Sequence, residues 1–114
     1  MRQIVLVLHY LKAKRVIHRD MKLGNILLGQ SLEVKVIDFG LAYVIKEFDE
    51  KLLEFCGTYI APEMIEDPRN ENKQGYSFEV DMWALGVMMY IMLIGKSPFR
   101  AKNKKALLKK IKNV

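Results

Sequence analysis

The chain has 114 residues, 51% of them hydrophobic and 28% charged, a composition that excludes a disordered or collagen-like protein and allows one domain. Its net charge of +6 arises at the C-terminal end, because residues 1–99 carry 12 basic and 13 acidic side chains and every charged side chain after them is basic. The longest apolar run, Met82–Gly95, is shorter than the roughly 20 residues of a membrane-spanning helix. The single cysteine, Cys56, excludes an internal disulfide, so we expect an intracellular location, in the cytoplasm, the nucleus or both.

The N-terminal part of the chain predicts a helix, a short strand and a β-hairpin. Gln3–Leu11 has the apolar pattern of the end of a helix, and Val16–Ile17 that of a short extended segment. The apolar runs Ile26–Leu28 and Leu32–Ile37 flank a Gly-Gln-Ser turn, which is typical of a hairpin. In the second run apolar residues alternate with charged ones, so one face is expected to be buried. The residues of that face are Leu32, Val34 and Val36.

A long loop and a short helix are expected next. Residues 41–60 show no clean period and carry several charges, which is typical of a functional loop. Pro62 favours a short helix over Ala61–Ile65, because proline fits the first turn of a helix. Residues 67–75 are polar and contain proline and glycine, so we expect them to be exposed.

Two helices are predicted in the remaining part of the chain. Glu79–Ile94 is apolar on nearly every side, so all faces of this helix are expected to be covered. Ser77 is a candidate N-cap, and Gly95 is expected to end the helix. Residues 102–113 place lysines opposite apolar residues, as in an amphipathic helix. Because this is the one basic element and no aromatic residues interleave with its lysines, we expect no nucleic-acid or membrane partner.

A polar cluster at residues 18–25, His-Arg-Asp-Met-Lys-Leu-Gly-Asn, resembles the catalytic loop of protein kinases. A carboxylate, an ammonium group and a carboxamide placed close together suit phosphoryl transfer. Asp20 can accept the proton of an attacking hydroxyl, and Lys22 can neutralise charge on the moving phosphoryl group. Asn25 can supply a hard oxygen ligand to Mg²⁺. The Asp-Phe-Gly that begins at Asp38 resembles the kinase metal-binding element, which implies that this carboxylate binds the Mg²⁺ that bridges the phosphates of ATP.

Three further elements follow in the order found in the kinase family. They are Gly57-Thr58, Ala61-Pro62-Glu63 and the Asp-Met-Trp-Ala-Leu-Gly that begins at Asp81. A lone Asp-Phe-Gly is a weak signal, but chance does not account for five elements in the right order. The lysine two residues after Asp20 is the serine/threonine pattern rather than the tyrosine one.

The resemblance covers essentially the whole chain and is strongest to the polo-like kinases. The stretches HRDMKLGN, LEVKVIDFGLA and GYSFEVDMWALGVMMYIMLIGKSPF are similar to that subfamily, and calmodulin-dependent kinases share much of the last one. The resemblance implies a serine/threonine protein kinase that uses ATP and Mg²⁺ and acts on a serine or threonine of a protein substrate. The fold that it implies is α+β, mainly α: part of the large, C-terminal lobe, with a small β-hairpin carrying the catalytic loop and the Asp-Phe-Gly.

The resemblance also implies roles for apolar and aromatic residues around the nucleotide. Leu27 would lie under the adenine ring, with Met88 and Met92 supporting it from the apolar helix. Plain core packing is an equally compatible role for the two methionines. His18 and Phe39 would stack on each other, which makes the histidine structural rather than a base.

Other implied contacts join the catalytic loop to distant parts of the chain. Asp81 would accept hydrogen bonds from the backbone around His18 and Arg19, and the alternative is that it is simply a helix N-cap. Thr58 would bond to the aspartate and lysine of the catalytic loop. The spacing from the Asp-Phe-Gly places Glu54 where polo-like kinases carry a phosphorylatable threonine. We hypothesise that Glu54 supplies a fixed negative charge for Arg19, although it can equally be a solvated acid.

The sequence departs from the kinase pattern in two further respects. It contains no Gly-x-Gly-x-x-Gly and no Val-Ala-Ile-Lys, so we expect residues 1–114 to be an internal C-lobe piece of a kinase domain without its N-lobe. The segment Gly57–Glu63 is two residues shorter than the family's Gly-Thr-Pro-x-Tyr-x-Ala-Pro-Glu. We expect this shortening to alter the floor on which a substrate chain rests.

Three functional interpretations remain open. The first is a serine/threonine kinase fragment that is inactive alone, because phosphate positioning carries most of the catalysis. The second is a non-catalytic, kinase-derived binding module or truncated gene product, in which the apolar flank of Glu79–Ile94 binds a partner. The third, the least favoured, is binding of nucleic acid through the basic residues 100–112, which a steep salt dependence would support.

Overall fold

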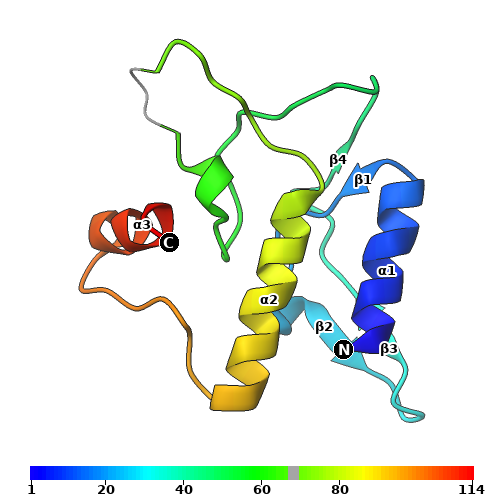
Figure 1. Cartoon of the computed structure of the whole chain (residues 1–114). Helices are drawn as coiled ribbons and strands as arrows, with labels where there is room; N and C mark the ends of the chain where they lie inside the picture. The colour runs from blue at the N-terminus through cyan, green and yellow to red at the C-terminus, as the bar shows by residue number, and fades with distance from the viewer. Residues whose placement is uncertain (67–69) are drawn as a thin grey trace.

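Two helices lie side by side in the structure, a computed structural model that describes residues 1–66 and 70–114, with α2 (Glu79–Ile94) at the centre and α1 (Arg2–Ala13) at one edge (Figure 1). α1 buries Ile4, Leu8 and Leu11, which recur every three or four residues as in an amphipathic helix. α2 packs against this face. The helix predicted over the first residues of the chain is therefore confirmed.

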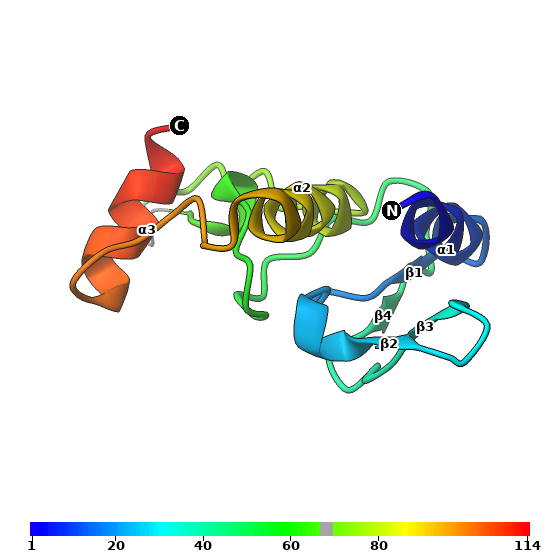
Figure 2. The same ribbon diagram turned by 90° about the horizontal axis from the view of Figure 1, so that it is seen from below.

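Two small antiparallel sheets lie next to the helices. β2 (Ile26–Leu28) pairs with β3 (Val34–Val36), which confirms the predicted hairpin, and Figure 2 shows this hairpin on one side of the helix pair. β1 (Val16–Ile17) pairs with β4 (Tyr43–Val44). β1 confirms the short extended segment predicted at Val16–Ile17. β4 lies within residues 41–60, which were expected to be a loop, because two residues are too few to show a period of two.

The hairpin buries less of its second arm than predicted. Val34 and Val36 are partly buried and pack against the residues between the helices. Leu32 is 70% exposed, so its prediction as a buried residue is wrong. The reason is local geometry: Leu32 has a φ of 60° and its amide donates to the carbonyl of Gly29, which places it in the turn and not in the strand.

Gly95 ends α2, as predicted. It adopts the left-handed conformation, with a φ of 79°, and its amide donates to the carbonyl of Ile91 at 2.7 Å. The start of the helix differs from the prediction, because the Ser77 side chain forms no cap. Instead, the Ser77 amide donates to the carboxylate of Glu79 at 2.9 Å, so an acid in the first turn orders this end.

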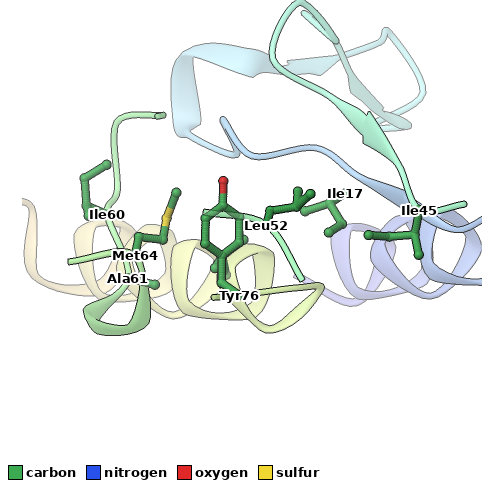
Figure 3. Packing of buried hydrophobic residues seen from close by; sticks show 8 residues of the cluster. Ile17, Ile45, Leu52, Ile60, Ala61, Met64 and Tyr76 are labelled. Atoms are coloured by element: carbon green, nitrogen blue, oxygen red, sulfur yellow. The ribbon is translucent and has the colours of Figure 1, made fainter. Parts of the chain in front are cut away.

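Buried apolar residues form two clusters, and α2 contributes to both. The first cluster lies around β1, the segment before α2 and the chain after residue 51 (Figure 3). It comprises Ile17, Ile45, Leu52, Ile60, Ala61, Met64, Tyr76 and Val80. The second lies between α1 and α2. It comprises Ile4, Leu8, Leu11, Met21, Ala84, Leu85 and Met88. Ile17, just before the candidate catalytic loop, belongs to the first cluster, and Ile26, just after it, packs against the second.

α2 is covered over its N-terminal half only. Buried residues end at Met88, whereas Met92, Leu93 and Ile94 are 50%, 71% and 53% exposed. The expectation that every face of this helix is covered is therefore wrong for the described residues. The lower end of α2 extends beyond the turn that carries Met88, and within this end only Ile91 is partly buried among the described residues (Figure 1).

The C-terminal part adds a 3₁₀ turn, η2 (Pro62–Met64), and a last helix, α3 (Lys104–Lys112), which contact each other. Both confirm predicted helical segments. Asn103 caps α3, because its side-chain oxygen accepts from the amide of Ala106 at 2.9 Å. Residues 70–74 are exposed, as predicted, whereas Gly75 is partly buried, and the part of that prediction on 67–69 lies outside the described residues. Along the described chain, no helix is both long and apolar enough to cross a membrane.

Candidate active site

The loop from His18 to Asn25 leaves β1 and is held at its start by a carboxylate from α2. Asp81 accepts a hydrogen bond from the His18 amide at 2.8 Å and another from the Arg19 amide at 2.9 Å. Arg19 has a φ of 66°, a left-handed conformation that turns both amides toward this one acceptor. The predicted contact of Asp81 is thus present, and an N-cap role alone does not describe the residue.

Burial governs the protonation of Asp81, which is only 5% exposed. Removal from water disfavours the charged carboxylate and raises its pKa above the ordinary value of 3.8. The amides of His18 and Arg19 act in the opposite direction, because they donate to the ionised form. The net direction is upward, so the two hydrogen bonds offset the desolvation only in part.

Asp20 is the point at which several candidate residues meet. Its Oδ1 accepts from the hydroxyl of Thr58 at 2.9 Å, and its Oδ2 lies 3.8 Å from Nζ of Lys22. Asn25, 5% exposed, donates from Nδ2 to the main-chain carbonyl of Asp20 at 2.8 Å and approaches its Oδ2 at 3.4 Å. Three side chains therefore fix the orientation of one carboxylate. The implied bond from Thr58 to the aspartate is present.

Asp38 lies next to the catalytic loop through the backbone of the hairpin. The amide of Ile37 donates to the carbonyl of Asn25 at 2.9 Å, one residue before Asp38. Asp38 has a φ of 62°, and its Oδ1 accepts from the amide of Gly40 at 3.2 Å. The left-handed backbone of Asp38 is strained, and the bond from Gly40 fixes the direction of its side chain. The carboxylate remains exposed to solvent.

The side chain of His18 links its loop to Ile37 and Phe39, on either side of Asp38. It is fully buried, its Nε2 donates to the carbonyl of Ile37 at 3.0 Å, and its Nδ1 accepts from the amide of Asp20 at 3.2 Å. One tautomer, with the proton on Nε2, satisfies both bonds. The ring of Phe39 meets the imidazole edge-on, with centroids 4.8 Å apart and planes at 63°. The predicted contact is present, with edge-to-face rather than stacked geometry, and the histidine has no nitrogen left to act as a base.

The side chain of Arg19 connects this loop to the segment after the Asp-Phe-Gly. Its Nε donates to the carbonyl of Leu41 at 2.6 Å, and its Nη1 lies 2.9 Å from Oε2 of Glu54. Burial lowers the pKa of Arg19, but hydrogen bonds to Tyr76 and Glu54 outweigh it and raise that pKa. The pairing of Arg19 with Glu54 hypothesised from the sequence is thus present as a contact.

Gly57 allows the segment that carries Thr58 to pass close to the loop. Its φ is 93°, and a Cβ built on it would lie 2.2 Å from the carbonyl oxygen of Arg19. No residue with a side chain fits that approach. The glycine therefore sets how near Thr58 comes to Asp20.

Leu27, the residue implied to lie under an adenine ring, sits in β2 and is 48% exposed. Met88 is fully buried between the helices, whereas Met92 is half exposed one turn further along α2. The two methionines implied to support the nucleotide therefore occupy different environments.

Sequence reasoning missed the tyrosines around Arg19. The ring of Tyr43 lies 5.7 Å from the guanidinium, and its hydroxyl donates to Glu50. Tyr76 is 1% exposed and reaches both Arg19 and Glu54 with its hydroxyl. Tyr43 stands among apolar residues and Tyr76 follows a polar stretch, and neither setting indicates a partner.

Comparison with known proteins agrees with the geometry. A curated maize protein named "Probable serine/threonine-protein kinase CCRP1" is 48% identical over 112 residues, which are 96% of this chain and 17% of that protein. The cell cycle serine/threonine-protein kinase CDC5/MSD2 of Saccharomyces cerevisiae is 46% identical over 96% of this chain and 15% of its own length. The serine/threonine-protein kinase polo of Drosophila melanogaster is 46% identical over 96% of this chain and 18% of its own.

The chain thus spans less than a fifth of the length of these relatives. The names of the relatives bear out the resemblance to polo-like kinases that the motifs indicated. The sequence profile of the protein kinase domain matches residues 1–114. The chain therefore belongs to the protein kinase domain family.

Proposed function

We propose that residues 1–114 are a C-lobe segment of a serine/threonine protein kinase, and that a complete domain containing them transfers the γ-phosphoryl group of ATP to a protein serine or threonine. The observation that carries this proposal is the arrangement around Asp20, whose carboxylate is oriented by Lys22, Asn25 and Thr58. A general base needs such orientation before its pKa matters.

Each proposed role follows from the chemistry of the side chain. Asp20 accepts the proton of the attacking hydroxyl. Lys22, 3.8 Å from that carboxylate, neutralises negative charge on the phosphoryl group in transit. Thr58 holds the aspartate in place from the segment on which the substrate would rest.

Asn25 and Asp38 are the proposed protein ligands of Mg²⁺. Nδ2 of Asn25 donates to the carbonyl of Asp20, which leaves the amide oxygen for a cation. Within the described residues, no group of three or more histidine, cysteine, aspartate or glutamate side chains is placed to hold a metal. A pair of oxygen donors fits Mg²⁺, which keeps waters and takes further ligands from substrate phosphates. When bound, the ion and ATP would supply the phosphoryl group and neutralise its charge.

Leu27 is the proposed floor of the adenine site, and Arg19 and Glu54 form the proposed regulatory pair. The exposed half of Leu27 offers an apolar surface for a base. The Glu54 carboxylate, whose side chain is 67% exposed, gives Arg19 one negative charge without phosphorylation. We place this kinase inside the cell, on the basis of its single cysteine alone.

The 114 residues alone are proposed to transfer no phosphate. They contain neither the Gly-rich loop nor the phosphate-binding lysine on which positioning of ATP depends. Transfer of phosphate to casein by the purified 114-residue chain would contradict this part of the proposal.

A non-catalytic binding module is the second candidate, and one observation favours it. The last turns of α2 expose three consecutive apolar side chains, Met92, Leu93 and Ile94. A module of this kind would bind its partner through that surface, and substitution of Asp20 would not affect binding.

The proposed activity is testable in a chimera in which residues 1–114 replace the aligned segment of the Drosophila relative. We expect ATP- and Mg²⁺-dependent phosphorylation of a protein substrate at serine or threonine. Substitution Asp20→Asn should lower the rate by about 10² to 10⁴, because it removes the proposed base. Asp49→Asn, in an exposed position of the loop, is the matched control and should leave the rate unchanged. Equal activity of the Asp20→Asn chimera and the unaltered one would refute the proposed role.

A further inference from the structure

Tyr76 lies in the stretch that resembles polo-like kinases, where the sequence assigns it no role, and it joins three parts of the site. Its hydroxyl donates to the main-chain carbonyl of Glu54 and accepts from Nη1 of Arg19 at 3.3 Å. Its backbone exchanges two hydrogen bonds of 2.9 Å with Leu52. Tyr76 is also among the largest fully buried side chains, at 1% exposure. Figure 3 shows its ring between Met64 and Leu52, with the hydroxyl pointing away from α2.

We propose that Tyr76 is a positioning residue: its hydroxyl ties the backbone at Glu54 to the guanidinium of Arg19 and so sets where Thr58 meets Asp20. This inference rests on the proposed kinase function and deepens it, because the segment in question is the one on which the substrate would rest.

The tie acts on the backbone and not on the side chain of Glu54. The carboxylate of that residue is largely exposed, so water weakens its bond to Arg19. The bond from the hydroxyl of the buried Tyr76 is itself partly buried, and removal from water makes a hydrogen bond stronger and the loss of its partner more costly. The position of the segment therefore depends more on Tyr76 than on the charge at Glu54.

Two contacts bracket the short path from Glu54 to Thr58. The first is the hydroxyl of Tyr76 at the Glu54 carbonyl. The second is the close approach of Gly57 to the carbonyl of Arg19. The first end is thus linked to Arg19 through Tyr76, the second lies against the Arg19 carbonyl, and the Thr58 hydroxyl just beyond it bonds to Asp20. Release of the first contact frees the segment without altering the loop, because Asp81 still binds both loop amides.

The substitution Tyr76→Phe separates this role from packing, because it keeps the buried ring and removes only the hydroxyl. Tyr90→Phe removes a hydroxyl from a 41% exposed site on α2 and is the matched control. The first measurement is amide hydrogen exchange of the 114-residue chain. We expect faster exchange across residues 52–58 in Tyr76→Phe, with residues 2–13 and the control unchanged.

The second measurement is the kinetics of the chimera with the Drosophila relative. We expect Tyr76→Phe to raise KM for a peptide substrate about tenfold, the effect of one lost hydrogen bond to a charged group, with KM for ATP unchanged. A purely structural role would instead lower the melting temperature and weaken ATP and peptide alike.

The outcomes distinguish this inference from the proposed function. Unchanged exchange across residues 52–58 in Tyr76→Phe overturns the tie. Altered exchange with an unchanged peptide KM, or with ATP and peptide weakened equally, overturns the positioning role. A chimera that is inactive before any substitution refutes the proposed kinase function, and exchange then still decides whether the tie exists.

Discussion

The carboxylate of Asp81 in α2 accepts a hydrogen bond from the backbone amide of Arg19, 62 residues earlier in the chain, at 2.9 Å. The other oxygen of the same carboxylate accepts from the neighbouring amide of His18 at 2.8 Å. The amides of His18 and Arg19, at the start of the candidate catalytic loop, are thus both satisfied by a single buried side chain.

Substitution Asp81→Asn is expected to lower the free energy of unfolding by about 1 to 3 kcal/mol, the cost of one unsatisfied buried donor. An amide offers one oxygen acceptor, and its NH₂ group would face the other backbone donor, so His18 or Arg19 loses its partner. Urea denaturation of the 114-residue chain measures the effect. The exposed Asp49→Asn variant is the control, and equal stability of the two variants would contradict the prediction.

The pH dependence of stability tests the protonation of Asp81. Burial raises the pKa of this carboxyl above its ordinary 3.8, so the folded chain binds the proton more tightly than the unfolded chain. This contribution is fully present below pH 3.8 and is lost as pH rises through the folded pKa. The difference in unfolding free energy between the unaltered chain and Asp81→Asn should therefore shrink above pH 3.8 and then level off. A difference that grows over this window would show that the pKa is lowered instead.

Glu54 allows a test of the regulatory pair in the chimera with the Drosophila relative. If its carboxylate supplies the charge that Arg19 needs, both Glu54→Thr and Glu54→Ala should lower the rate in unphosphorylated protein. The loss should be small, within about tenfold, because an exposed ion pair contributes less than about 1 kcal/mol. Phosphorylation of the introduced threonine should restore activity. Equal rates for all three unphosphorylated proteins would contradict the proposed role of Glu54.

The sequence predicted the elements that carry a strong local signal. The hairpin follows from two β-branched runs, and the end of α2 follows from Gly95. The contacts of Asp81 and Phe39 followed from the resemblance to kinases, because each contact joins residues far apart in the chain and no local pattern specifies it. Each was expected and is present.

The contacts that the sequence did not predict are also long-range, and no local pattern specifies them. Tyr76 reaches Arg19 across 57 residues, and β4 is only two residues long. The exposure of Leu93 was missed for another reason: an apolar helix indicates that something covers it, but not which residues do. The periodicity of apolar residues shows which face of a helix is apolar, but it does not show which segment packs against that face.

The close approach of Gly57 to the backbone of Arg19 can be tested by adding a side chain at position 57. Gly57→Ala would place a Cβ 2.2 Å from the carbonyl oxygen of Arg19 and would force an L-residue to a φ of 93°. The chain must shift there, at a cost of about 1 to 3 kcal/mol, and the bond of Thr58 to Asp20 should be lost. The melting temperature and the peptide KM of the chimera measure the two effects.

Gly86 is the matched control for this substitution. It lies within α2, and a Cβ built on it meets nothing within 4 Å. Gly86→Ala should therefore stabilise the chain by up to about 1 kcal/mol, because alanine is the better helix former. If both alanine variants behave alike, the close approach at Gly57 does not determine the position of the segment.

Met88 and Met92 provide the last test, because they carry the same side chain one turn apart on α2 in opposite environments. Met88 is fully buried, so Met88→Ala should leave a cavity and cost about 2 to 5 kcal/mol of unfolding free energy. Met92 is half exposed, so Met92→Ala should change stability by less than about 0.5 kcal/mol. Urea denaturation of the 114-residue chain distinguishes the two variants. Similar losses at both positions would mean that the last turns of α2 are covered in solution, and the apolar surface that favours a binding module would then not be free.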